Sequence, residues 1–274
     1  MVDWNQIKEE IRQIARQDVC LAFSGGVDSS ILLKLLCDAA RQEGSRVYAV
    51  TFETRLHSPA DLETARKVAE ETGAVHCVLE VDESENEAIL YNPADRCYLC
   101  KKYLFSRLIQ FGQEHGVQVF LDGTNADDLH VYRPGIRALR ELGIRSPLAE
   151  LGITKGQVRE MAAALGLSVA SRPSAPCLAT RIPYGTRLDF QLFERIDQGE
   201  TFLKKLGFPT VRLRVHQDIA RIEVPAEQIG LLAAKKDAVV GRLKELGFVY
   251  ITADLEGFRS GSMDIYVNRD ESAL

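Results

Sequence analysis

The sequence predicts an α/β protein, with a parallel sheet in the first part of the chain and a smaller α+β region at its end. Two observations support this prediction. Between residues 19 and 165, short apolar runs alternate with segments of helical periodicity, and strands joined by helices form parallel sheets. After residue 185, the pattern changes to a hairpin flanked by helical segments. We therefore expect one domain over residues 1–185 and a second over 186–274.

The first domain should contain four strands and four helices after its N-terminal segment. The predicted strands are 19–23, 47–52, 75–81 and 117–121, and the predicted helices are 31–40, 59–72, 101–114 and 155–165. Thr154 is a typical N-cap for the last of these helices. Ligands of such sheets bind at the carboxyl ends of the strands. Three of these ends, at 24–30, 51–55 and 123–125, should therefore form one site.

The second domain should be a small α+β layer. Its predicted elements are a helix over 188–206, a hairpin of strands 210–215 and 219–224, a long helix over 226–246 and a strand over 248–252. In an extended strand, Arg212, Arg214 and His216 lie on one face. Such a basic stripe is usually a solvated surface, so the pattern alone does not indicate a site.

Composition limits the possible partners. The 274 residues are 46% hydrophobic and 27% charged, which is ordinary for a globular protein. No apolar run reaches the roughly 20 residues of a membrane span, and the first residues begin an acidic amphipathic helix rather than a signal peptide. The net charge of −5 argues against a long nucleic acid as partner. We expect a cytoplasmic protein with no membrane or nucleic-acid partner.

The most informative segment follows the first predicted strand: Ser24-Gly25-Gly26-Val27-Asp28-Ser29-Ser30. The two glycines allow backbone amides to approach an anion closely, and Ser29 and Ser30 lie in the first helical turn, where unpaired amides favour negative charge. A carboxylate here is costly beside a phosphate unless a divalent cation lies between them, so Asp28 is a predicted Mg²⁺ ligand. Neither the P-loop nor the dinucleotide-binding spacing occurs in the chain.

This seven-residue segment resembles the pyrophosphate loop of the PP-loop ATP pyrophosphatases. The resemblance implies that ATP adenylates a carbonyl or carboxylate oxygen and that pyrophosphate is released. It also implies that adenine lies near Thr51 and Phe52, and that Gly123, Thr124 and Asn125 lie beside the nucleotide. On its own, the turn at 123–125 is a weak signal, because its residue types are common in turns.

Six cysteines in such a chain are more typical of thiols or metal ligands than of a disulfide framework. Cys20, Cys37 and Cys77 lie in apolar runs and are predicted core residues. Cys177 differs, because it lies in residues 171–185, a segment with three prolines and a glycine that predicts a rigid loop. Nearby Arg172 and Arg181 would favour its thiolate form, which is the nucleophile.

Cys97 and Cys100 form a C-x-x-C pair. Together with Cys177, they supply three thiolates, which can hold a [4Fe-4S] cluster with one iron open. A zinc site usually needs four protein ligands, and the chain has no second C-x-x-C. An unmetallated redox pair would be expected to open a helix directly after a strand, whereas Cys97 follows a turn. We favour the cluster, and zinc and the redox pair remain alternatives.

Three further segments extend the resemblance to one family. Together with the pyrophosphate loop, the segments 92–101, 176–181 and 212–216 look like LarE, and the likeness spans nearly the whole chain. Membership would imply an ATP-dependent sulfur transferase that converts a pyridinium-3,5-biscarboxylic acid mononucleotide to its thiocarboxylate, for the nickel-pincer nucleotide cofactor of lactate racemase. The sulfur would come either from a cluster-bound sulfide or from Cys177 itself, which would then remain as dehydroalanine.

The same resemblance assigns further roles. Arg212 and Arg214 would bind the substrate's phosphate, and Arg181, Glu200 and Glu223 would lie near that site, the two glutamates as metal or acid–base groups or as simple partners of arginine. The family also implies a homo-oligomer, with a hexamer as one candidate, and an upstream source of sulfide or cysteine-derived sulfur.

Three other functions share parts of this pattern. A tRNA thiolase would use the same adenylation and cysteines but should carry a basic tract or an RNA-binding module, and neither is evident. An amidating ligase such as an NAD synthetase would not need Cys177. A nucleotide-binding regulatory protein would release no pyrophosphate with any substrate.

Overall fold

The computed structural model describes residues 4–130 and 134–264, which form two compact units. The first unit comprises residues 4–54, 59–89 and 95–175. The second comprises residues 55–58, 90–94 and 176–264. The division falls ten residues before the expected boundary at 185. Two short segments of the first part of the chain therefore belong to the second unit.

Backbone hydrogen bonds explain this boundary. The amide of Leu178 donates to the carbonyl of Leu56 (2.8 Å), and the amide of Gly185 donates to that of Asn92 (3.0 Å). The buried Asn92 side chain also donates to the carbonyl of Pro183 (2.9 Å). Residues 176–185 are thus held by segments far away in sequence, which no local pattern signals.

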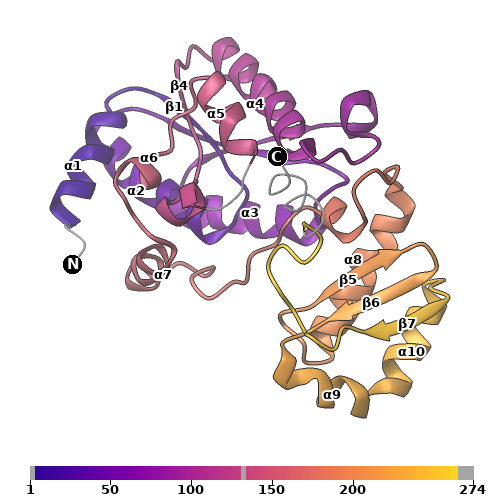
Figure 1. Cartoon of the computed structure of the whole chain (residues 1–274). Helices are drawn as coiled ribbons and strands as arrows, with labels where there is room; N and C mark the ends of the chain where they lie inside the picture. The colour runs from indigo at the N-terminus through magenta and orange to yellow at the C-terminus, as the bar shows by residue number, and fades with distance from the viewer. Residues whose placement is uncertain (1–3, 131–133, 265–274) are drawn as a thin grey trace. The chain divides into compact units, whose positions relative to one another are not determined.

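The first unit is built on a parallel four-stranded sheet in the order β3-β2-β1-β4 (Figure 1). The strands are β1 (Val19–Ala22), β2 (Val47–Glu53), β3 (Val75–Glu80) and β4 (Val119–Leu121). The predicted parallel sheet is therefore confirmed. Because β1 lies between β2 and β4, the segment that follows β1 lies in the middle of the carboxyl edge.

Helices cover both faces of this sheet. They are α1 (Trp4–Ile14), α2 (Val27–Glu43), α3 (Pro59–Thr72), α4 (Arg96–Glu114), α5 (Gly135–Glu141), α6 (Pro147–Glu150) and α7 (Lys155–Ala164), with short 3₁₀ turns η1 (Glu83–Glu85), η2 (Glu87–Ile89) and η3 (Ala126–His130). Side chains of β2 alternate between two cores. Val47 and Ala49 pack with α1, α2, α3 and α7, whereas Tyr48 and Val50 pack with α4 and α5.

One helix of the first unit begins earlier than predicted. We expected a helix from residue 101, but α4 begins at Arg96, and the carbonyl of Asp95 accepts the amides of Tyr98 (2.9 Å) and Leu99 (3.1 Å). Cys97 and Cys100 therefore lie at the N-terminal end of this helix, about one turn apart. Asp95 is a residue type that N-caps favour, but its side chain makes no cap hydrogen bond here.

The second unit is an α+β layer. Its elements are η4 (Leu178–Arg181), α8 (Phe190–Lys205), β5 (Arg212–His216), β6 (Ile219–Glu223), η5 (Ala226–Gln228), α9 (Ile229–Ala234), α10 (Lys236–Glu245) and β7 (Tyr250–Ala253). Strand β6 is antiparallel to β5, as the hairpin pattern predicted, and parallel to β7. The prediction of one helix over 226–246 is wrong. The helix is interrupted at Lys235, whose ammonium donates to the carbonyl of Leu206 (2.6 Å).

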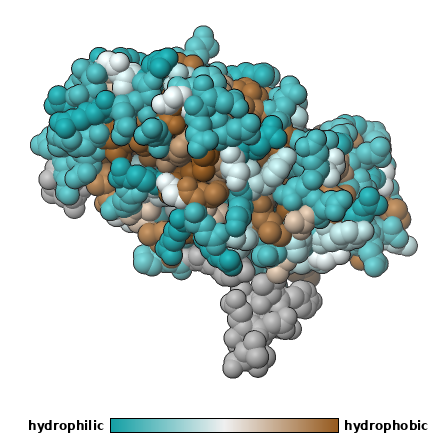
Figure 2. All heavy atoms as spheres, turned by 90° about the horizontal axis from the view of Figure 1, so that it is seen from above, coloured by the Kyte–Doolittle hydropathy of each residue, from teal (hydrophilic) through white to brown (hydrophobic). Residues whose placement is uncertain are grey.

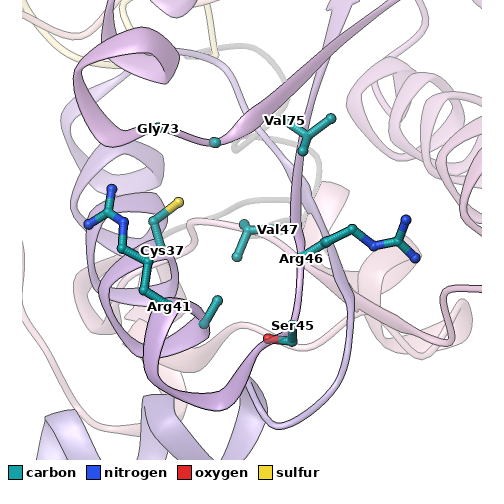
Figure 3. Close-up of a pocket in the computed structure, with 9 residues that line it drawn as sticks. Cys37, Arg41, Ser45, Arg46, Val47, Gly73 and Val75 are labelled. Atoms are coloured by element: carbon teal, nitrogen blue, oxygen red, sulfur yellow. The ribbon is translucent and has the colours of Figure 1, made fainter.

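Most side chains on the face shown in Figure 2 are hydrophilic, with smaller hydrophobic patches between them. No helix of the described residues is long and apolar enough to cross a membrane. A cavity of about 160 Å³ lies near the amino ends of β2 and β3, beside Cys37, Arg41 and Arg46 (Figure 3). Both arginines already pair with aspartates, and burial raises the pKa of the Cys37 thiol to about 11. This cavity is at the edge of the sheet opposite the predicted nucleotide site.

Candidate active site

The segment from Ser24 to Ser30 forms a tight turn from β1 into α2. Gly25 has φ +68°, and a Cβ atom placed there would lie 2.8 Å from the amide nitrogen of Ala65 in α3. Gly26 is the N-cap, and its carbonyl accepts the first helical hydrogen bond, from the amide of Ser30 (2.9 Å). Only glycine fits at position 25, and the turn presents the first amides of a long helix.

Hydroxyl groups line the inside of this turn. The Oγ atoms of Ser24 and Ser29 lie 3.3 Å apart, and Ser29 Oγ donates to the carbonyl of Gly26 (3.1 Å). The fully buried Ser30 hydroxyl has no hydrogen-bond partner among the described residues. Amides, hydroxyls and a helix N-terminus together form the donor set that a polyphosphate requires.

Asp28 is held from two directions. Asn125 Nδ2 donates to its Oδ1 atom (3.0 Å), and the ammonium of Lys155 pairs with its Oδ2 atom. A cation therefore already lies beside this carboxylate. Mg²⁺ commonly binds one or two carboxylates together with substrate phosphates and water, so Asp28 fits the predicted role with a nucleotide present.

Lys155 is a functional candidate that the sequence did not reveal. It is the first residue of α7, and a capping box formed by Thr154 and Gln157 fixes this start. A lysine at the beginning of a helix has no distinctive pattern, and its partner Asp28 lies 127 residues earlier. The only related prediction was that Thr154 is the N-cap of the helix that Lys155 begins.

The turn after β4 lies against the same loop. A Cβ atom at Gly123 would be 2.8 Å from the amide nitrogen of Ser29, so the two turns touch. The next residue, Thr124, donates its hydroxyl to buried Asp122 (2.6 Å). The structure thus brings residues 123–125 beside the phosphate loop, where the resemblance expected them.

Thr51 and Phe52 follow a different pattern. The buried Thr51 hydroxyl donates to the carbonyl of Phe23 (2.7 Å) and lies 2.9 Å from His76 Nε2. The Thr51 hydroxyl is therefore used in hydrogen bonds within the protein and does not face an open site. Burial, assisted by Arg66, lowers the pKa of His76. The ring of Phe52 lies on the other face of the sheet, 6.3 Å from that of Phe105.

Cys20 and Cys37 are buried as predicted, whereas Cys77, also a predicted core residue, is only half-buried. Burial raises the pKa of Cys20 to about 12, with Cys77 as a lesser cause. Cys97 and Cys100 are half-buried, form no disulfide and lie one turn apart in α4. Their spacing places both sulfurs on one side of the helix, which suits two thiolate ligands of one cluster. The nearly fully buried Arg96 donates to the sulfur of Cys97 (3.4 Å).

Cys177, the third predicted ligand, lies in the second unit just before η4 and is also half-buried. Its carbonyl accepts the Thr180 hydroxyl (2.8 Å) and Arg181 Nη1 (3.3 Å). In the first unit, Arg172 instead pairs with Asp61 (2.6 Å). Over residues 4–130 and 134–264, no group of three His, Cys, Asp or Glu side chains is placed to hold a metal ion.

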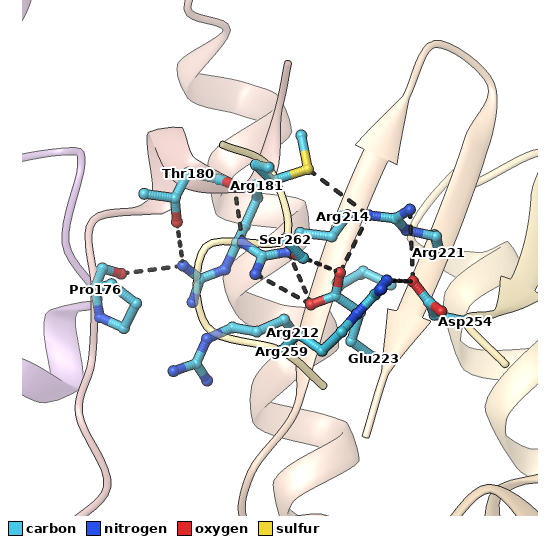
Figure 4. Close-up of polar contacts among 12 residues, drawn as sticks. Pro176, Thr180, Arg181, Arg212, Arg214, Arg221, Glu223, Asp254, Arg259 and Ser262 are labelled. Atoms are coloured by element: carbon cyan, nitrogen blue, oxygen red, sulfur yellow. Dashed lines mark hydrogen bonds and ion pairs between the residues drawn. The ribbon is translucent and has the colours of Figure 1, made fainter. Parts of the chain in front are cut away.

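Arginines and carboxylates form a largely buried cluster in the second unit, shown in part in Figure 4. Arg181 and Glu200 form a bidentate pair (2.8 and 3.0 Å), and Glu200 also accepts the amide of Leu213 (2.9 Å). Burial acts to raise the pKa of Glu200, but these bonds outweigh it, and the pKa is lowered. Glu200 therefore remains an ionised partner of arginine.

Glu223 is the centre of the same cluster. It accepts Arg214 Nε (3.1 Å), Arg221 Nη2 (3.1 Å) and the Ser262 hydroxyl (2.8 Å) (Figure 4). Asp254 lies 3.5 Å from Arg221 and 3.4 Å from Arg259. Arg212 and Arg214, to which the resemblance assigns the substrate's phosphate, are buried on β5, unlike the usual solvated basic stripe.

This cluster comprises Arg181, Arg212, Arg214, Arg221, Arg259, Glu200, Glu223, Asp254 and Glu256, which pairs with Arg259 (2.5 Å). Among the described residues, its five guanidinium groups face four carboxylates, which leaves one positive charge in excess. Burial, followed by the charge of Arg181, lowers the pKa of Arg212 to about 10. A buried cationic excess of this kind favours binding of an anion.

Comparison with known proteins agrees with this geometry. Residues 10–171 match the family model described as Asparagine synthase. The pyridinium-3,5-bisthiocarboxylic acid mononucleotide synthase of Lactiplantibacillus plantarum is 39% identical over 248 residues, which are 90% of this chain and 89% of that protein. The chain belongs to the LarE family. The predicted α/β fold of the PP-loop ATP pyrophosphatases and the predicted class, an ATP-dependent sulfur transferase, are confirmed by this membership.

Two other relatives show how far the likeness extends. An uncharacterized protein of Synechocystis sp. is also 39% identical to this LarE-family chain, over 89% of this chain and 91% of that protein. The tRNA-specific 2-thiouridylase MnmA of Brucella suis is 30% identical over only 56% of this chain and 47% of that protein. The thiouridylase likeness is therefore partial, whereas the likeness to the mononucleotide synthase spans most of both chains.

Proposed function

We propose that this LarE-family protein adenylates a carboxylate of pyridinium-3,5-biscarboxylic acid mononucleotide with ATP and replaces the activated oxygen by sulfur. The product would be the thiocarboxylate needed for the nickel-pincer nucleotide cofactor of lactate racemase. The relative from Lactiplantibacillus plantarum, whose name contains the bisthiocarboxylic acid mononucleotide, supports this substrate class.

One observation of the structure supports a mononucleotide substrate most directly. The arginine cluster carries a net positive charge among the described residues, and a phosphate monoester is an anion of about −1.5 to −2 charges at neutral pH. The family resemblance makes Arg212 and Arg214 its candidate phosphate ligands. Arg214 already pairs with Glu223, as Arg181 does with Glu200. Glu200 and Glu223 then act by holding guanidinium groups in place.

In the first half-reaction, the substrate carboxylate oxygen attacks the α-phosphorus of ATP. The bond from that phosphorus to the β-phosphate oxygen breaks, and pyrophosphate leaves. The amides and hydroxyls from Ser24 to Ser30 would bind the phosphates, and Asp28 would hold Mg²⁺, which neutralises their charge. Lys155 is close enough to Asp28 to contact the phosphates when the nucleotide is bound.

In the second half-reaction, hydrosulfide attacks the acyl carbon, the bond to the phosphate oxygen of AMP breaks, and a proton is released. Cys97, Cys100 and Cys177 would hold a [4Fe-4S] cluster, which supplies the sulfide when bound. The structure supports two of these ligands as a pair in one helical turn.

The alternative sulfur source is Cys177 itself. Its thiolate would attack the acyl carbon and release AMP. Loss of the Cα proton and cleavage of the Cβ–S bond would then give the thiocarboxylate and leave dehydroalanine. Cys97 and Cys100 have no role in this version, so the two mechanisms predict different effects of the same substitutions.

Iron and acid-labile sulfide content of protein purified without oxygen would test the sulfur source. The cluster mechanism predicts near-stoichiometric iron that is lost in Cys97→Ala, Cys100→Ala and Cys177→Ala, while the matched control Cys37→Ala retains it. No iron after reconstitution would contradict the cluster. It would predict one sulfur transferred per chain and a spent protein lighter by the mass of hydrogen sulfide.

Three further expectations belong to this proposal: a homo-oligomer, with a hexamer as one candidate, a cytoplasmic location and an upstream source of sulfide or cysteine-derived sulfur. Substrate-dependent pyrophosphate release would test the substrate. Cys177→Ala should retain this release and lose sulfur transfer. An amidating ligase would keep its full activity in that variant.

A further inference from the structure

Lys101 immediately follows the cysteine pair and has no hydrogen bond from its ammonium to any described residue. Its Nζ atom lies 3.7 Å from Asp122 Oδ2, too far for a hydrogen bond, and 5.6 Å from the ring centre of Phe105. The side chain is 36% exposed. All three ammonium protons are therefore available to a ligand.

Asp122 does not need Lys101 as a partner. This buried carboxylate already accepts the Thr124 hydroxyl (2.6 Å), the Ser146 hydroxyl (2.5 Å) and the amide of Thr124 (3.2 Å). These bonds hold the turn that contacts the phosphate loop. Lys101 and Asp122 therefore form a long ion pair (3.7 Å) without a hydrogen bond, and this pair holds the ammonium near the carboxylate.

The absence of a side chain at Gly135 makes room for the stem of Lys101. A Cβ atom at Gly135 would lie 2.7 Å from Cδ of Lys101 and 3.4 Å from the carbonyl oxygen of Cys97. Gly135 has no positive φ angle, so its backbone does not require glycine. The absence of a side chain instead leaves room for the Lys101 stem beside the first turn of α4.

Two features of the first unit thus meet at Lys101. The cysteine pair occupies the same helical turn, and Asp122 begins the turn that packs, through Gly123, against Ser29 of the phosphate loop. The phosphate loop has its own amide donors and lies near Lys155, whereas Lys101 lies on the side of the cysteines. A cation here would neutralise a second anion that approaches the α-phosphate.

We propose that Lys101 binds the substrate carboxylate that becomes adenylated. The inference rests on the proposed function and adds a binding residue to it. Attack of a carboxylate on a phosphate brings two anions together, and an ammonium beside both reduces their repulsion. Lys101 is a substrate-binding residue in this account, and Asp122 and Gly135 position it.

The test compares Lys101→Met with Lys102→Met, because both substitutions remove an ammonium and keep an unbranched stem. Lys102 is the adjacent residue, is 49% exposed and pairs with Glu141. We expect Lys101→Met to weaken binding of the dicarboxylate mononucleotide about tenfold or more and to lower substrate-dependent pyrophosphate release. Binding of ATP alone should stay within about twofold, and Lys102→Met should match the wild type.

A second variant tests the same geometry without removing the charge. Gly135→Ala would displace the Lys101 stem, so it should also weaken substrate binding, and it should add no loss to Lys101→Met. Equal substrate affinity in Lys101→Met and Lys102→Met would overturn the inference, as would a loss confined to ATP binding. If the wild type itself releases no pyrophosphate with this substrate, the proposed function fails instead.

Discussion

The phosphate loop and the arginine cluster both favour anions, but they are built in opposite ways. The loop uses backbone amides and hydroxyls from seven consecutive residues, and its main constraint is that no side chain fits at position 25. The cluster uses charged side chains from residue 181 to residue 259, most of them buried. A site made of consecutive backbone can be recognised in a sequence, whereas a site made of distant side chains cannot.

The difference predicts that the cluster is more sensitive to removal of one charge. Glu223→Ala would leave Arg214 and Arg221 without their shared buried carboxylate, and loss of one partner of a buried pair costs about 3–5 kcal/mol. Thermal or urea unfolding should show this loss. Glu245→Ala, at an exposed carboxylate paired with Arg242, should change stability by about 0.5 kcal/mol or less. Equal effects would show that the cluster is not a desolvated unit.

The phosphate loop should respond mainly in activity. Asp28→Ala removes the carboxylate beside the phosphates, and a comparable electrostatic loss in an active site costs about 10²–10³ in rate. Substrate-dependent pyrophosphate release would measure it. Asp38→Ala, on the exposed side of the same helix, is the matched control and should keep full activity. A large loss of stability in Asp28→Ala would contradict the comparison.

The sequence predicted the first unit well because its signals are local. Apolar runs and helical periodicity located all four strands of its sheet, and the glycine-rich turn indicated the nucleotide edge. The start of α4 was missed because residues 92–95 were interpreted as a turn and the residues up to 100 as its continuation. Lys155 was missed because its role depends on Asp28, far away in the chain.

The second unit was predicted in outline and not in detail. Its hairpin was visible from alternation, but Arg212 and Arg214 were expected to be solvated without the family resemblance. Their burial depends on Glu200 and Glu223, which lie on α8 and β6. The break at Lys235 was also missed, because the residues on both sides are good helix formers.

A smaller effect is expected at the boundary of the nucleotide site. Thr154 caps α7, and its hydroxyl and Gln157 form a reciprocal capping box. Thr154→Ala should destabilise the protein by about 1 kcal/mol, and Thr154→Ser should restore most of it. Because Lys155 is the first residue of the helix that this cap starts, pyrophosphate release should also fall modestly. A loss as large as that of Asp28→Ala would mean that the cap itself contacts the nucleotide.

The smallest expected effect is a pH dependence of stability that arises in the second unit. Burial, reinforced by Arg221, lowers the pKa of His216 at the end of β5. The unfolded chain then binds this proton more readily than the folded protein, so stability should fall as the pH drops below about 6.5. Melting temperatures between pH 7.5 and 5.5 should show this fall, and His216→Gln should reduce it. The exposed His130 provides the control, since His130→Gln should leave the pH dependence unchanged. An identical slope in all three proteins would show that protonation of His216 does not limit the stability of the arginine-rich unit.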